Sequence, residues 1–103
     1  MPKAKTREER EYHEQIAGMR WCALCDALGS AGAQDVHVHH IRDGQGSGQR
    51  ASHWLVVPLC PSCHQGPMGV HGDRTFMRIA KVEELDLLAA TIRRVARLEG
   101  VVG

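Results

Sequence analysis

The first half of the chain combines a polar helical pattern with an extended one. Thr6, followed three residues later by Glu9, forms the T-x-x-E pattern of a capping box and predicts a charged helix over residues 6–19. His13 within it is expected to be exposed to solvent. Residues 35–41 alternate in polarity and carry β-branched side chains, so they predict a strand.

The second half begins with a short apolar segment, residues 54–59. A short helix is predicted to begin near Pro61 and to end at Gly66 and Pro67. From Thr75 onward the chain is predicted to be helical. Its apolar residues recur at helical spacing and form a stripe that faces either the core or a partner. The stripe comprises Val82, Leu85, Leu88, Ala89, Ile92, Val95 and Ala96.

Four cysteines lie in two Cys-x-x-Cys pairs: Cys22 with Cys25, and Cys60 with Cys63. Each such turn can present two thiolates to one tetrahedral ion, so the two turns together predict a structural Zn²⁺ site. Two disulfides or a thioredoxin-like redox pair are the alternatives. The charged N-terminus lacks the apolar segment of a secretory signal, which predicts a cytoplasmic protein, and reducing conditions there favour metal binding.

Length and charge limit the possible functions. A chain of 103 residues predicts one domain with a small core, to which metal binding would add stability. No apolar run approaches the roughly 20 residues of a membrane-spanning helix, so no membrane partner is expected. The net charge of +1 gives little overall attraction to DNA, and any nucleic-acid binding must come from a local patch of Arg and Lys.

The histidines suggest a second inorganic site. His39 and His40 are adjacent on the predicted strand and therefore point to opposite faces, so one can bind a metal ion while the other faces a substrate. His64, at the start of the predicted short helix, can reach the same ion. Few protein ligands would leave positions for water and phosphate oxygens, which is typical of a catalytic metal site.

Three segments carry a family resemblance. VHVHHI, SHWLVVPLC and CPSCHQ, flanked by the two cysteine pairs, resemble the HNH endonucleases over roughly residues 20–80. More narrowly, the stretch from HHIRDGQGSGQRAS to GVHGD resembles small phage nucleases of the recombination-enhancement (Ref-like) kind. The resemblance implies an α+β fold with a small ββα-metal (His-Me finger) core, a four-cysteine structural zinc, and flanking N- and C-terminal helices. Residues 1–20 would form the charged tail and helix, 21–80 the nuclease core and 81–103 the C-terminal helix.

The resemblance also implies a role for each histidine at a motif position. His40 would be the general base, and His39 and His64 would be metal ligands. His71 would be a third ligand or would contact the scissile phosphate. The family commonly has Asn between the strands to orient the base, whereas this chain has His53 near that place, which makes His53 a candidate catalytic residue.

The implied function is a metal-dependent DNA endonuclease or nickase that leaves a 5′ phosphate and a 3′ hydroxyl. A neutral imidazole can accept a proton from water at pH 7. Mg²⁺ or Mn²⁺ is the expected ion, and imidazole ligands would also accept Ni²⁺ or Co²⁺. Arg42, Arg50 and Arg74 flank the predicted centre and are candidate phosphate-binding residues, with ordinary surface charges as the alternative. A phage or prophage origin, and hence a bacterial host cytoplasm, follows from the narrower resemblance.

Two other interpretations stay open. One is a non-catalytic zinc-stabilised module that binds nucleic acid or protein through its C-terminal helix. The other assigns an additional, purely structural zinc to the histidines. His39, His40 and His64 together favour the nuclease, because a zinc module needs none of them. The sequence leaves open the oligomeric state, and with it the choice between nicking and double-strand cleavage.

Overall fold

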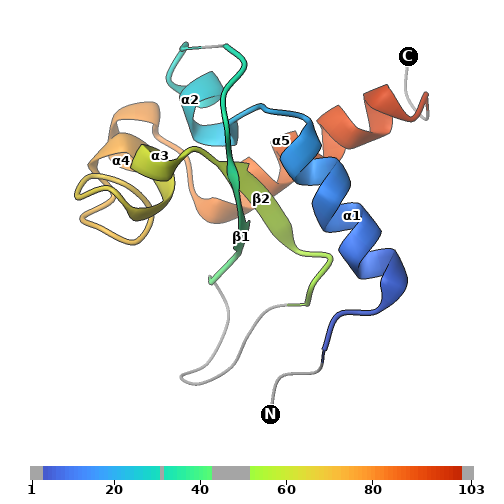
Figure 1. The fold of residues 1–103 in the computed structure, drawn as a ribbon. Helices are drawn as coiled ribbons and strands as arrows, with labels where there is room; N and C mark the ends of the chain where they lie inside the picture. The colour runs from blue at the N-terminus through green and yellow to red at the C-terminus, as the bar shows by residue number, and fades with distance from the viewer. Residues whose placement is uncertain (1–3, 31, 43–51, 101–103) are drawn as a thin grey trace.

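A computed structural model describes residues 4–30, 32–42 and 52–100. The predicted loop at 44–49 and the candidate phosphate-binding residue Arg50 lie outside the described residues. The elements, in chain order, are α1 (Arg7–Gly18), α2 (Ala23–Ala27), β1 (His37–His40), β2 (Val56–Leu59), α3 (Pro61–Gln65), α4 (Thr75–Ala80) and α5 (Glu84–Leu98). The two strands form an antiparallel pair among the helices, so the fold is α+β, as predicted (Figure 1).

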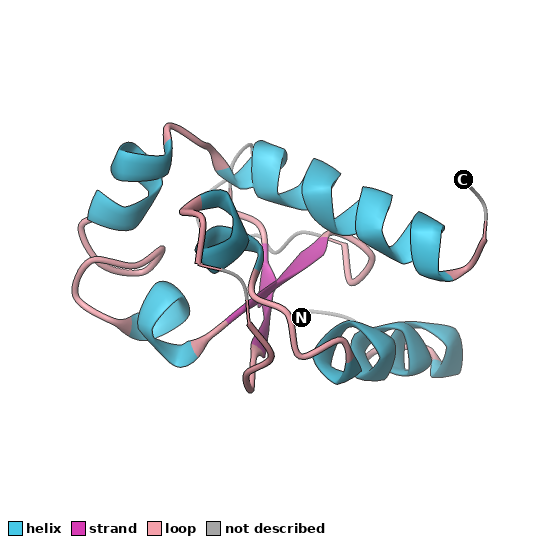
Figure 2. Ribbon diagram, turned by 90° about the horizontal axis from the view of Figure 1, so that it is seen from above, coloured by secondary structure: helices cyan, strands magenta, loops and turns pink. Residues whose placement is uncertain are grey.

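The strand pair depends on its surroundings. An isolated two-stranded sheet is marginally stable in water, so it needs a hydrophobic partner. Helices α1 and α5 both pack against it, and the strands lie between them when the molecule is seen from above (Figure 2). Every residue of β2 is buried, with Val56, Val57 and Leu59 fully excluded from solvent. The strand that faces β1 is therefore also the centre of the core.

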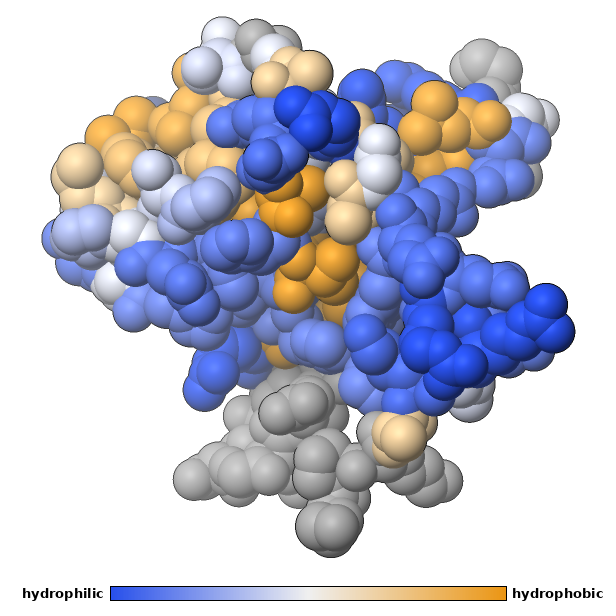
Figure 3. All heavy atoms as spheres, in the orientation of Figure 1, coloured by the Kyte–Doolittle hydropathy of each residue, from blue (hydrophilic) through white to orange (hydrophobic). Residues whose placement is uncertain are grey.

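Helix α1 begins with the predicted capping box. Thr6 Oγ1 accepts a hydrogen bond from the Glu9 amide at 3.1 Å, and Glu9 Oε1 accepts one from the Thr6 amide at 2.7 Å. Its outer surface is hydrophilic, as Figure 3 shows. The expectation that His13 is exposed is wrong: it is only 6 % exposed, because it lies with Ile16 on the face that packs against the strands.

The prediction of continuous helix from Thr75 onward is wrong at one point. Helix α4 ends at Ala80, and Lys81 adopts the left-handed conformation with φ of 57°. Helix α5 then begins with its own capping box, in which the amide of Glu83 donates to Asp86 Oδ2 at 2.8 Å. The chain therefore turns between two helices where the apolar pattern alone suggests one.

The predicted apolar stripe is only partly buried. Leu85 and Ile92 are 55 % and 51 % exposed, whereas the buried face of α5 carries Leu87 and Leu88. These two leucines share that face with Glu84 and Thr91, at the spacing i, i+3, i+4 and i+7. The helix is rotated relative to the prediction because a carboxylate, not a leucine, occupies the first inward position.

No helix within the described parts of the chain is long and apolar enough to cross a membrane.

Candidate active site

The four cysteine sulfurs converge at the starts of two short helices. Cys22 precedes α2 and Cys60 precedes α3, and all four Sγ atoms lie within 4.8 Å of one another. Cys25 Sγ is 3.7 Å from both Cys60 Sγ and Cys63 Sγ. Two sulfurs about 2.3 Å from one tetrahedral zinc lie about 3.8 Å apart, whereas a disulfide needs about 2.05 Å. The cysteines are free, and their spacing fits a metal ion such as zinc.

The thiols cannot all ionise without a cation. A hydrogen bond from Cys63 lowers the pKa of Cys22 to about 5, and the same hydrogen bond raises the pKa of Cys63. Desolvation by burial raises the pKa of Cys25 to about 11. A divalent cation would remove this competition, because each thiolate would then face positive charge instead of another sulfur.

Three histidines from separate elements form a second group that could hold a metal ion. His39 lies on β1, His64 on α3 and His71 in the loop after α3, and one ring nitrogen of each lies within 4.8 Å of the others. His64 Nε2 and His71 Nε2 are 3.1 Å apart. Two nitrogens about 2.1 Å from one ion at a right angle lie about 3.0 Å apart.

The protonation state of this group also suits a metal. Desolvation, followed by repulsion from His39, His71 and His37, lowers the pKa of His64 to about 4. Desolvation is likewise the first cause of the lowered pKa of His71. Both rings are therefore neutral at pH 7, which is the form that binds a cation.

Glycines allow His71 to approach His64. The loop after α3 folds back onto that helix, so the amide of Val70 donates to Cys63 O at 2.7 Å and that of His71 to His64 O at 3.1 Å. A Cβ atom on Gly69 would lie 2.4 Å from Cys63 O. That distance is far below contact distance, so only glycine permits the loop to pack this closely. The cysteine turn and the histidine group are consequently parts of one local structure.

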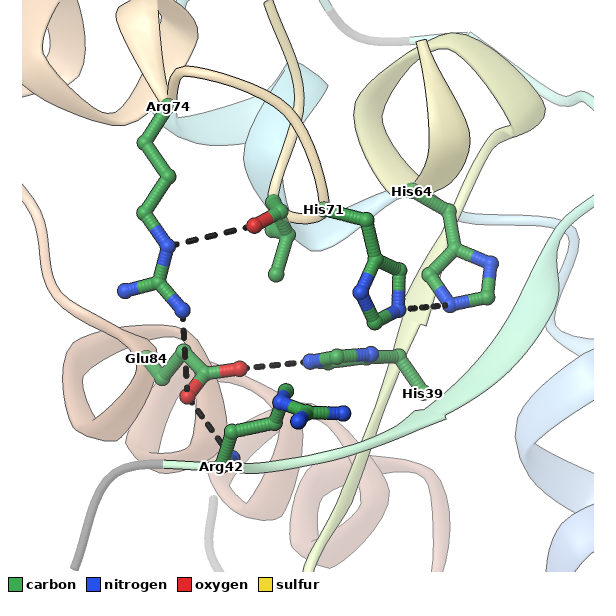
Figure 4. Close-up of polar contacts among 7 residues, drawn as sticks. His39, Arg42, His64, His71, Arg74 and Glu84 are labelled. Atoms are coloured by element: carbon green, nitrogen blue, oxygen red, sulfur yellow. Dashed lines mark hydrogen bonds and ion pairs between the residues drawn. The ribbon is translucent and has the colours of Figure 1, made fainter. Parts of the chain in front are cut away.

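A buried carboxylate orients His39. Glu84, at the start of α5, is fully buried, and His39 Nε2 donates to its Oε2 at 2.5 Å. Its other oxygen, Oε1, accepts from the Arg42 amide at 2.7 Å and lies 3.8 Å from Arg74 Nη2 (Figure 4). Because Nε2 of His39 carries the proton that Glu84 accepts, Nδ1 is the nitrogen left to bind a metal.

His40 belongs to a different group, together with His13 and His53. His40 Nε2 and His53 Nδ1 are 3.0 Å apart. The ammonium of Lys5 can only donate, so His13 Nδ1 accepts from it at 3.3 Å, and His13 Nε2 therefore donates to the His53 carbonyl at 2.6 Å. One ring nitrogen of each of these three histidines also lies within 4.8 Å of the others. The two engaged nitrogens of His13 fit a hydrogen-bonded support for His53 better than a metal ligand.

The chain matches a known protein family over most of its length. A family model described as "Recombination enhancement, RecA-dependent nuclease" matches residues 5–94. The chain belongs to this family. No curated protein and no solved structure matches it. The recombination-enhancement resemblance inferred from the sequence is therefore confirmed. The matched residues include both histidine groups, the four cysteines and Glu84, so all the site residues described above lie within the family match.

The structure separates the candidate site residues into neighbouring groups. His39, His64 and His71 lie together, while His40 lies beside His53. Adjacent residues of a strand point to opposite faces, so the two groups flank β1. Arg42 and Arg74 both border the contact between His39 and Glu84.

Two residues of this nuclease that matter to the geometry were missed from the sequence. Glu84 follows Glu83, which caps α5, so both acidic residues resemble ordinary charges at a helix start. The available signal was the helical spacing of Glu84 to Leu87 and Leu88. This spacing puts the Glu84 carboxylate on an apolar face, where a charged group needs a partner. No sequence signal separates the other missed residue, His13, from its polar neighbours on α1.

Proposed function

We propose that the chain is a metal-dependent DNA endonuclease or nickase of the HNH type, in which β1, β2 and α3 form the ββα-metal core. One observation carries the proposal: two adjacent histidines of β1 belong to two different groups of side chains. His39 joins a group suited to a metal, and His40 joins a hydrogen-bonded pair on the opposite face of β1. Hydrolysis of a phosphodiester needs both a cation at the phosphate and a base for the water, at short range.

His40 would act as the general base. It is partly exposed, so water can reach it, and His53 lies within hydrogen-bonding distance of its Nε2. His53 is in turn fixed through its carbonyl by buried His13. This support would hold the His40 ring in one orientation while it accepts the proton of the attacking water.

His39, His64 and His71 would hold the catalytic ion. When bound, the ion would neutralise a non-bridging phosphate oxygen and stabilise the departing 3′ oxygen. Mg²⁺ or Mn²⁺ remains the expected ion, but three imidazoles suit Ni²⁺ and Co²⁺ as well. The four cysteines would hold the structural Zn²⁺, and Glu84 would fix the orientation of His39.

Arg42 and Arg74 would contact the DNA near the scissile bond. Arg42 is exposed and Arg74 is partly exposed, and both lie beside Glu84. Phosphate contacts of this kind position the substrate without reading its sequence. Arg50 is proposed for the same role from the sequence alone.

The test is cleavage of supercoiled plasmid by the purified protein with Mg²⁺, Mn²⁺, Ni²⁺ or no added ion, in the presence and absence of RecA. The wild type is expected to nick or linearise the plasmid only when an ion is added. The variant His40→Ala is expected to lose cleavage while keeping the same bound metal, measured by native mass spectrometry. If His40→Ala cuts as fast as the wild type, His40 is not the base. An inert wild type under every condition would instead favour the non-catalytic binding module.

A further inference from the structure

An open groove, lined by three cationic residues, runs along helix α4 and the start of α5. The groove has a volume of about 760 Å³. Its cations are Arg74, Arg78 and Lys81, and its apolar lining includes Met77, Val82 and Leu85. Of these three cations, only Arg74 was a candidate DNA contact from the sequence.

The three cations are spread along α4: Arg74 precedes its first residue, Arg78 lies within it and Lys81 follows its last residue. Arg74 and Lys81 flank the helix with left-handed backbone conformations, and all three cations line the same groove. Cations at the start, middle and end of α4 could contact more than one phosphate of a strand that runs along the groove.

Arg78 is oriented by hydrogen bonds, and both Arg78 and Lys81 are exposed to solvent. Arg78 donates to the carbonyl of Asp73 and, at 3.0 Å, to Thr75 Oγ1, which orients its guanidinium on the helix. Arg78 and Lys81 are both exposed, and neither forms an ion pair within the described part of the chain. Glu83 is the one acid in the lining, and its side chain accepts a hydrogen bond from the first turn of α5.

One end of the groove lies next to the group formed by His39, His64 and His71. Arg74 lines the groove and also donates to Val70 O at 3.1 Å, next to His71 in the chain. The same guanidinium lies 3.8 Å from Glu84, which holds His39 (Figure 4). A strand whose phosphate lies at the histidine group could therefore continue directly along α4.

We propose that this groove binds the sugar–phosphate backbone of the DNA strand on one side of the scissile bond. The proposal rests on the nuclease function above. Arg78 and Lys81 contact successive phosphates, and the exposed Leu85 side chain contacts the apolar faces of the sugars. Binding here is independent of base sequence, because phosphates are the same at every position.

The experiment measures DNA binding without cleavage, in a His40→Ala background. The affinity for a fluorescent duplex is measured by anisotropy between 50 and 200 mM salt. The groove variant is Arg78→Gln with Lys81→Gln, and its matched control is Arg93→Gln with Arg97→Gln, which removes the same charge from exposed positions on α5. Melting temperatures check that both variants fold.

Losing two phosphate contacts is expected to reduce the slope of log affinity against log salt by about 1.8. Between 50 and 200 mM salt, the fold-decrease in affinity of the groove variant would then be about 12 times smaller than that of its parent. The α5 control is expected to keep the parental slope. Equal effects of the two variants, an unchanged slope in the groove variant, or no measurable binding by the parent would each overturn the proposal. If the groove variant shows the reduced slope but the wild-type protein does not cleave plasmid, the groove proposal stands and only the proposed nuclease function is refuted.

Discussion

Replacing Glu84 by glutamine tests whether the buried carboxylate controls the metal group. Each of its two oxygens accepts from a donor: His39 Nε2 at 2.5 Å and the Arg42 amide at 2.7 Å. Glutamine has the same shape but only one acceptor oxygen. In Glu84→Gln the amide NH₂ must therefore face either the Arg42 amide or the ring of His39. If it faces His39, that ring must protonate at Nδ1 to accept from it, and Nδ1 is the nitrogen proposed to bind the ion.

The size of the effect follows from burial. Glu84 is fully buried and His39 is 3 % exposed, so solvent cannot replace the lost hydrogen bond. A hydrogen bond to a charged group contributes about 1.5–3 kcal/mol, which corresponds to a decrease in melting temperature on the order of 10 °C for a domain of this size. Loss of a partner that orients a metal-ligating histidine typically weakens metal binding about 10- to 100-fold.

The assay is isothermal titration of Ni²⁺ or Co²⁺ into protein prepared with one equivalent of Zn²⁺, which the four cysteines are proposed to hold. The ring ¹⁵N shifts of His39, measured by NMR before metal is added, report which nitrogen is protonated. Glu14→Gln is the matched control, because it removes the same charge from an exposed position on α1. Wild-type affinity and an unchanged His39 tautomer in Glu84→Gln would refute the reasoning.

Three further predictions address the metal sites. Gly69→Ala should weaken the histidine metal site in the same titration, because its Cβ would lie 2.4 Å from a backbone carbonyl, whereas Gly18→Ala meets nothing within 4 Å and should bind normally. Cys25→Ser should lose the tightly bound zinc and the cooperative melting transition, since a structural zinc contributes about 10–16 kcal/mol to folding in small domains; elemental analysis showing one retained zinc would contradict this. Because the pKa of His64 falls from 6.5 to about 4 on folding, the metal-free protein should lose stability as the pH falls from about 6.5 towards 4. Denaturant melts of the wild type and His64→Gln should show a weaker pH dependence in the variant.

Local chemistry explains what the sequence could predict. The capping box of Thr6 and Glu9 acts within one helical turn, so it could be identified without any tertiary information. The cysteine spacing is informative for the same reason, because each Cys-x-x-Cys turn is a local structure that can bind metal. The alternation of side chains along β1 likewise predicts that His39 and His40 face opposite ways.

Long-range pairings explain what could not be predicted. Glu84 contacts a histidine 45 positions away, and His13 contacts a carbonyl 40 positions away. Helical periodicity tells which residues share a face, but not which of two possible faces is buried. In α5 that choice brought Glu84 inward and left Leu85 exposed, contrary to the predicted stripe.

The dependence of His39 on Glu84 has a consequence during synthesis of the protein. The cysteine pairs and all the histidines precede Glu84 in the chain, so a ribosome completes them first. Until α5 emerges and folds, His39 lacks the carboxylate that orients it, and the proposed metal site stays incomplete. A nascent or prematurely terminated chain would consequently bind the proposed ion more weakly, which would limit damage to nucleic acids near the ribosome by an unfinished nuclease.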